Sequence, residues 1–84
     1  MAETEAPLRD LLESLTRRIV EHPDEVSVEQ FIEEDGTVVL ELAVGDDDYG
    51  RVIGRGGRTA SALRTVVKAA AVREKRRVLV DIVD

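Results

Sequence analysis

Cysteine is absent from this sequence, and Phe31 and Tyr49 are its only aromatic residues. Without cysteine the chain has no disulfide and no thiolate metal ligand, which fits a reducing compartment. Two aromatic side chains are too few for the stacking platforms with which sheet-surface and barrel-type proteins hold nucleic-acid bases. The sequence therefore excludes a disulfide scaffold and disfavours aromatic base stacking.

Long apolar runs are also missing. No stretch approaches the roughly 20 apolar residues that cross a bilayer, and the acidic start Met1 to Glu5 is unlike a signal peptide. A chain of 84 residues makes one domain with a small core. We therefore expect a cytoplasmic protein without membrane contact, in which residues 1–7 form a flexible tail and residues 8–84 form a single domain.

Residues suited to catalysis are few. His22 is the only histidine, no general acid-base pair is evident, and the serines lack a nucleophile context. Asp46, Asp47 and Asp48 could form a magnesium site, but consecutive carboxylates in a loop are more often helix caps and solvated charge. We therefore expect no enzyme, no cofactor and no metal.

Charge is divided unequally along the chain. Residues 1–50 hold 3 Lys/Arg against 15 Asp/Glu, a net charge of −12, whereas residues 51–84 hold 9 against 3, a net charge of +6. Because salt screens exposed charges more than about 8 Å apart, a local basic face can bind an anion although the pI is near 4.7. The alternative is a solvated helix face. The other cations of this half are Arg64, Lys68, Arg73, Lys75, Arg76 and Arg77.

The spacing of apolar residues predicts six elements in the order α-β-β-α-α-β. A helix begins at Leu8 and should end at His22-Pro23, because proline cannot continue it. Asp35-Gly36 lies between two apolar runs and predicts a hairpin. The three aspartates suit the N-terminus of the next helix. The remaining elements are strands over about 26–32, 38–44 and 77–83 and helices over about 47–53 and 58–74.

A glycine loop lies between the last two helices, at Gly54-Arg55-Gly56-Gly57. Its glycines let the main chain approach a ligand, and the amides at the start of the following helix favour anions. Arg51 and Arg58 flank the loop and, with Arg55, are the best candidates for phosphate contacts. The alternative is a plain interhelical turn, and the loop lacks the Gly-x-x-x-x-Gly-Lys-Ser/Thr pattern of nucleotide hydrolases.

The Gly-x-x-Gly loop, with the pair Val52-Ile53 before it, resembles that of K-homology (KH) domains, and the element order resembles their type II variant. Three separated segments are similar to the KhpA family of small bacterial single-KH proteins, and together they cover nearly all of the chain after Pro7. These segments are Glu21 to Val28, Gly50 to Gly54, and Ala60 to Lys75. The resemblance implies an α+β fold with a three-stranded mixed sheet and helices packed on one face.

The resemblance also implies a site for single-stranded RNA. In KH domains the loop contacts the backbone of about four unpaired nucleotides, and an aliphatic groove beside it receives the bases. Gly54, Arg55, Gly56 and Gly57 correspond to that loop. Val52 and Ile53 would form groove walls, opposite Val38 to Val44 or the neighbouring strand, although core packing is the alternative for either residue. Relatives usually carry a larger polar residue at the position of Gly56, so this loop should be more flexible and bind more weakly.

Partners are implied by the same resemblance. Members of the KhpA family self-associate as dimers, pair with the larger KH protein KhpB, also called Jag, and are linked to RNA regulation, cell elongation and division. We therefore expect an RNA chaperone or post-transcriptional regulator that influences cell shape and cell wall organisation. The rival hypothesis is a dimerisation module with little RNA binding, and helix three and its neighbourhood would be its contact surface.

Overall fold

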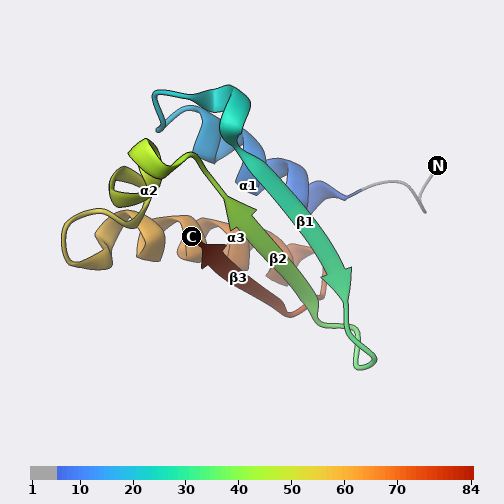
Figure 1. The fold of residues 1–84 in the computed structure, drawn as a ribbon. Coiled ribbons are helices and arrows are strands. Elements are labelled where there is room, and N and C mark those ends of the chain that lie inside the picture. The colour runs from blue at the N-terminus through green and yellow to red at the C-terminus, as the bar shows by residue number, and fades with distance from the viewer. Residues whose placement is uncertain (1–5) are drawn as a thin grey trace.

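The computed structural model describes residues 6–84, in which the chain forms three α-helices, three β-strands and two short 3-10 turns (Figure 1). None of these helices is long and apolar enough to span a membrane. Pro7 is the first residue of α1, where proline is well tolerated, so it does not belong to the predicted tail; residues 1–5 of that tail lie outside the described residues. The elements are α1 (Pro7–Arg17), η2 (Pro23–Glu25), β1 (Ser27–Ile32), β2 (Val38–Ala43), α2 (Asp46–Ile53), η3 (Arg55–Gly57), α3 (Arg58–Arg73) and β3 (Val78–Val83).

The three strands form one mixed sheet in the order β1-β2-β3. β1 and β2 are antiparallel and are joined by the predicted Asp35-Gly36 turn, in which the Asp35 carboxylate accepts a hydrogen bond from the Thr37 amide at 2.9 Å. β2 and β3 are parallel. Parallel neighbours need a crossover, and here α2, the glycine loop and α3 provide it.

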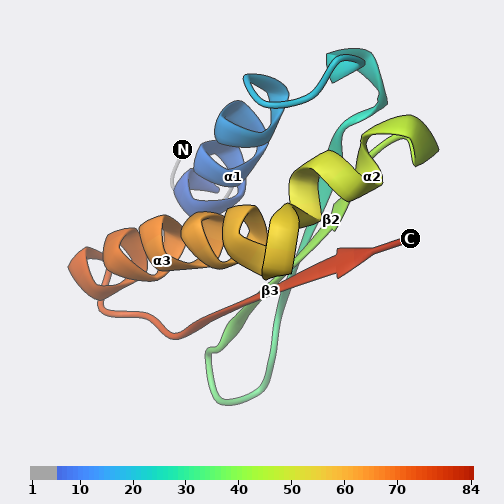
Figure 2. The same cartoon turned by 90° about the vertical axis from the view of Figure 1, so that its left-hand side faces the viewer.

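Both long helices cover one face of this sheet, and the other face is open (Figures 1 and 2). Every second strand residue points to the helices, as the alternating burial of β2 shows. The predicted α+β class, with a three-stranded mixed sheet and helices packed on one face, is thus confirmed. The core consists of Leu8, Leu12, Val26, Val28, Val38, Leu40, Leu42, Val52, Leu63, Val67, Ala71, Val78 and Val80.

Helix α1 ends earlier than its apolar pattern predicts, at Arg17 instead of near Pro23. The amides of Ile19 and Val20 both bond to the Thr16 carbonyl, which closes the helix with a tight turn. Ile19 and Val20 still pack against the core, but from irregular backbone. The apolar spacing therefore predicted buried residues correctly and placed the end of the helix wrongly.

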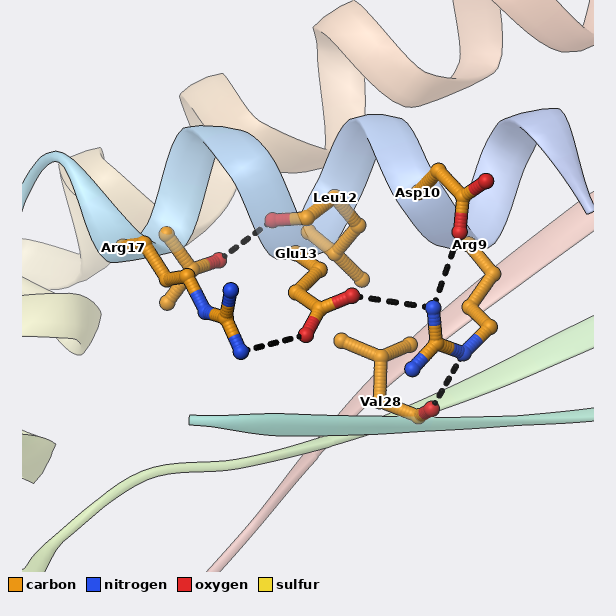
Figure 3. A network of polar contacts seen from close by, with 7 residues as sticks. Arg9, Asp10, Leu12, Glu13, Arg17 and Val28 are labelled. Carbon is orange, nitrogen blue, oxygen red and sulfur yellow. Dashed lines mark hydrogen bonds and ion pairs between the residues drawn. The ribbon is translucent and has the colours of Figure 1, made fainter. Parts of the chain in front are cut away.

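One arginine from each of the two long helices donates a hydrogen bond to an edge strand of the sheet. Arg9 on α1 donates from Nε to the carbonyl of Val28 on β1 at 2.8 Å, and it also pairs with Asp10 and Glu13 (Figure 3). Arg64 on α3 donates from Nε to the carbonyl of Val80 on β3 at 3.1 Å. Each edge strand thereby has a backbone acceptor satisfied within the chain, which opposes edge-to-edge aggregation.

Candidate nucleic-acid interface

The glycine loop connects α2 to α3 and protrudes from the body of the domain (Figure 1). Gly54 ends α2, and Arg55, Gly56 and Gly57 form the 3-10 turn η3. Figure 2 shows α2 leading directly through this turn into α3. The four loop residues therefore form one short segment at the N-terminal end of the longest helix, and Arg55 and Gly56 in its middle are exposed.

Gly54 has the strictest backbone requirement in the loop. Its φ of 78° and ψ of 168° lie in a region that is essentially restricted to glycine. A Cβ at this position would lie 2.8 Å from the backbone nitrogen of Thr59 and would also meet the Thr59 side chain. Gly56 and Gly57 have φ of 64° and 77°, but a Cβ at either position would meet open space. The close packing of the loop against Thr59 therefore requires glycine at position 54, whereas positions 56 and 57 have room for a side chain.

The backbone amides of this loop are available to an anion. The Gly57 amide bonds to the Gly54 carbonyl, whereas the amides of Arg55 and Gly56 have no backbone acceptor among the described residues. No side chain caps α3, and its first turn contains no acidic residue, in contrast to the three aspartates in the first turn of α2. The positive end of the α3 dipole therefore has no negative partner within residues 6–84.

The three predicted phosphate contacts differ in their surroundings. Arg55 and Arg58 are exposed, and neither forms an ion pair within the part of the chain that the structure describes. Arg51 instead contacts the Glu21 carboxylate at 3.1 Å and lies 3.9 Å from that of Asp48. Among the described residues, the guanidinium groups of Arg55 in the loop and Arg58 after it have no counter-ion, whereas that of Arg51 is already paired.

Val52 and Ile53 also differ. Val52 has no exposed surface and belongs to the core, so the prediction that it lines a groove is corrected to core packing. Ile53 is partly exposed at the end of α2. Consecutive helix residues point in different directions, so only one of the pair can be fully buried against the sheet. The buried residue anchors the helix that carries the loop.

Asp48 has a role that the sequence did not predict. No side-chain hydrogen bond caps α2, so the prediction that the aspartates act as helix caps is wrong, whereas their predicted place in the first turn of this helix is confirmed. Asp48 is buried and accepts hydrogen bonds from the amides of Glu21 and His22 at 3.0 and 2.9 Å. It thus ties the segment after α1 to the helix before the loop. Residues 6–84 contain no cluster of His, Asp or Glu able to hold a metal ion.

Asp48 should make stability depend on pH. The Glu21 hydrogen bond, aided by that from His22, lowers the pKa of Asp48 below its ordinary 3.8 and outweighs the effect of burial, which would raise it. A group whose pKa is lower in the folded state stabilises the fold above its unfolded pKa, and that stability is lost as pH falls through the folded value. We expect Asp48→Asn to be less stable than the wild type at pH 7, with the difference shrinking below about pH 4.

Urea unfolding of both proteins from pH 7 to pH 3 measures this effect. The difference between the two proteins at each pH isolates the effect of residue 48. Two parallel curves of stability against pH would show that Asp48 is not the group responsible.

Comparison with known proteins agrees with this architecture. A family model described as the KH domain of KhpA/KhpB matches residues 9–82. "RNA-binding protein KhpA" of Clostridium acetobutylicum is 47% identical over 76 residues, which are 90% of this chain and 100% of that protein. The protein of the same name from Halalkalibacterium halodurans is 49% identical over 92% of this chain and 100% of its own length, and that of Leifsonia xyli is 51% identical over 92% and 97%.

A solved structure shares the fold at low sequence identity. The crystal structure of Era in complex with MgGDPNP and nucleotides 1506–1542 of 16S ribosomal RNA superposes with a TM-score of 0.63 at 13% identity. The match covers 89% of this chain and 28% of the Era chain, so it supports the fold alone. The family match and the α-β-β-α-α-β order agree with each other, and the chain therefore belongs to the KhpA/KhpB family of type II KH domains, a non-enzymatic family.

Proposed function

We propose that this protein binds single-stranded RNA by holding its sugar-phosphate backbone on the Gly54 to Gly57 loop. The observation that carries the proposal is the uncapped N-terminal end of α3, where the Arg55 and Gly56 amides have no backbone acceptor among the described residues. Arg55 and Arg58 add positive charge beside those amides. Relatives over nearly the whole chain are named RNA-binding proteins, which supports RNA over other anions.

The bases would rest on aliphatic surface beside the loop. Ile53 is partly exposed, and so is Ile82, which packs against the core from β3. Because β2 and β3 are parallel and Ala43 pairs with Val83, the end of β3 lies close to the point where the chain enters α2. We propose Ile53, at the end of α2 beside the loop, as one wall of the groove, and Ile82 on the strand that ends near the start of α2 as the candidate for the other.

The salt dependence of binding tests how many arginines take part. For single strands the slope of log affinity against log salt is about −0.7 per phosphate neutralised, so Arg55 and Arg58 together should give about −1.4. Arg55→Ala/Arg58→Ala should flatten the slope toward zero. Fluorescence anisotropy of a labelled unstructured RNA over a series of salt concentrations measures both values.

Arg51→Ala is the matched control, because Arg51 is already paired with Glu21. Its slope should equal that of the wild type. A slope near −2.1 in the wild type, reduced by about 0.7 in Arg51→Ala, would mean that Arg51 leaves Glu21 and contacts phosphate. An unchanged slope in the double variant would remove Arg55 and Arg58 from the interface.

The physiological part of the proposal rests on family membership. We propose a cytoplasmic RNA chaperone or post-transcriptional regulator that acts with a KhpB/Jag-like partner and influences cell shape and cell wall organisation. Sequencing of RNA crosslinked in cells to the wild type and to a loop variant would identify the transcripts and test this role.

A second candidate function, dimerisation, is favoured by an apolar groove between α1 and α3. The groove has a volume of about 250 Å³, and its lining includes Leu15, Ile19, Leu63 and Val66. Val66 belongs to the apolar stripe of α3 but is 46% exposed, so one part of the stripe is not covered within the described residues. A second copy would bury it. Sedimentation of the purified protein distinguishes monomer from dimer.

A further inference from the structure

The open face of the sheet carries side chains in rows that run across the strands. Glu41 on β2 pairs with Glu29 on β1 and with Asp81 on β3, so three carboxylates lie side by side. Each of the three directly follows a buried residue that faces the helices, and successive strand residues point to opposite faces, so the three carboxylates point away from the core. We refer to Glu29, Glu41 and Asp81 as the acidic row.

An apolar row lies next to it. Val39 on β2 pairs with Phe31 on β1 and with Leu79 on β3. Phe31 is 48% exposed and Leu79 is 54% exposed, which is unusual for large apolar side chains that lie together. We refer to Phe31, Val39 and Leu79 as the apolar row. The sheet face that carries both rows is turned toward the viewer in Figure 1.

The acidic row costs stability in the isolated domain. Like charges directly opposite each other on neighbouring strands are destabilising. No ion pair within residues 6–84 involves any of the three carboxylates. The outward-facing strand positions contain no Lys or Arg; they are Ser27, Glu29, Phe31, Val39, Glu41, Ala43, Leu79, Asp81 and Val83.

Charge decides what can cover this face. RNA and anionic lipid are repelled by three unpaired carboxylates. A second copy placed face to face would bring two acidic rows together, which disfavours self-association through the sheet. A protein segment with Lys or Arg beside apolar side chains would neutralise the acidic row and bury the apolar row at the same time.

We propose that the open sheet face is a docking surface for a different protein, whose contact segment presents Lys or Arg to Glu29, Glu41 and Asp81 and apolar side chains to Phe31, Val39 and Leu79. This surface is distinct from the glycine loop, which belongs to the α2–α3 crossover. The protein can therefore hold RNA and a protein partner at the same time.

Site-specific photocrosslinking tests the proposal in cells that produce the full chain. Benzoylphenylalanine at position 79 places the crosslinker in the apolar row, and benzoylphenylalanine at position 14 is the control, because Ser14 is exposed on α1, which covers the opposite face of the sheet. We expect position 79 to crosslink a different protein through a segment in which mass spectrometry finds Lys or Arg next to apolar residues. Position 14 should not give this product.

The variant Glu29→Gln/Glu41→Gln/Asp81→Asn removes the charges and keeps the shapes. It should reduce the position 79 crosslink at least tenfold. It should also unfold at a temperature no lower than the wild type, because it removes repulsion, and bind RNA with unchanged affinity. A crosslink to RNA, a crosslink to a second copy, no protein crosslink above the level of position 14, or an unchanged yield in the neutral variant would each overturn the proposal.

Discussion

Arg55→Asp/Gly56→Asp should weaken binding to a short unstructured RNA by about 100-fold at low salt. The variant removes one guanidinium group and places two carboxylates where we assign the phosphates. Each change is worth about 1 kcal/mol for unit charges about 4 Å apart in water, and 1.4 kcal/mol corresponds to a factor of ten. The fold should survive, because Asp tolerates the left-handed backbone of Gly56 and nothing lies within 4 Å of a Cβ there.

The variant Arg55→Asn/Gly56→Asn distinguishes the effect of side-chain charge on RNA binding from that of side-chain size. Asparagine has the same size as aspartate and also tolerates a positive φ, so this variant loses only the guanidinium contact. Because one such contact is worth about 1 kcal/mol, the variant should bind RNA about fivefold more weakly than the wild type. Equal losses in both variants would mean that side-chain bulk and not charge prevents binding. Wild-type affinity in the aspartate variant would show that RNA does not contact the loop.

The confirmed predictions concern parts of the fold that are marked by sequence patterns over a few neighbouring residues. Asp35-Gly36 supplies the turn that joins β1 to β2, and the predicted bounds of α3 differ from Arg58–Arg73 by one residue at its end. The apolar run from Val38 to Val44 predicted a strand, and β2 extends over Val38–Ala43. These features depend on residues a few positions apart, which a single sequence displays directly.

The features that sequence reasoning missed depend on contacts between distant residues. Asp48 looked like a helix cap, yet its carboxylate binds amides 26 and 27 positions earlier in the chain. Those bonds hold the segment after α1 in an irregular path. Arg64 looked like a solvated helix residue, but it bonds to the edge of β3. No local pattern distinguishes these residues from ordinary surface charge.

The candidate site was predictable in its backbone and less so in its side chains. The glycine pattern marked the loop correctly as the connection between two helices. Whether Val52 or Ile53 faces the core depends on how α2 is rotated on the sheet, and whether Arg51 is available depends on Glu21, which is 30 positions away. The sequence therefore could not show that Arg51 is ion-paired, whereas Arg55 and Arg58 have no ion pair within residues 6–84.

Gly54→Ala should lower the free energy of unfolding by about 3 kcal/mol, because a backbone conformation reserved for glycine costs about 1–3 kcal/mol and overpacking costs a similar amount. The added methyl group would meet Thr59 in the first turn of α3, including its backbone nitrogen, which a side-chain rotation cannot move. Relief requires a shift between α2 and α3, which carry the loop. Thermal unfolding should show a midpoint roughly 12–24 °C below the wild type for a domain of this size.

Gly56→Ala is the matched control, since it changes the same residue type in the same loop. Its φ of 64° strains alanine by about 1 kcal/mol, but its Cβ would meet open space, so the loss should be about a third of that in Gly54→Ala. RNA binding should follow the same order, because a displaced loop no longer aligns the Arg55 and Gly56 amides. Similar losses in the two variants would contradict the close approach of Gly54 to Thr59, since backbone strain alone would then account for both.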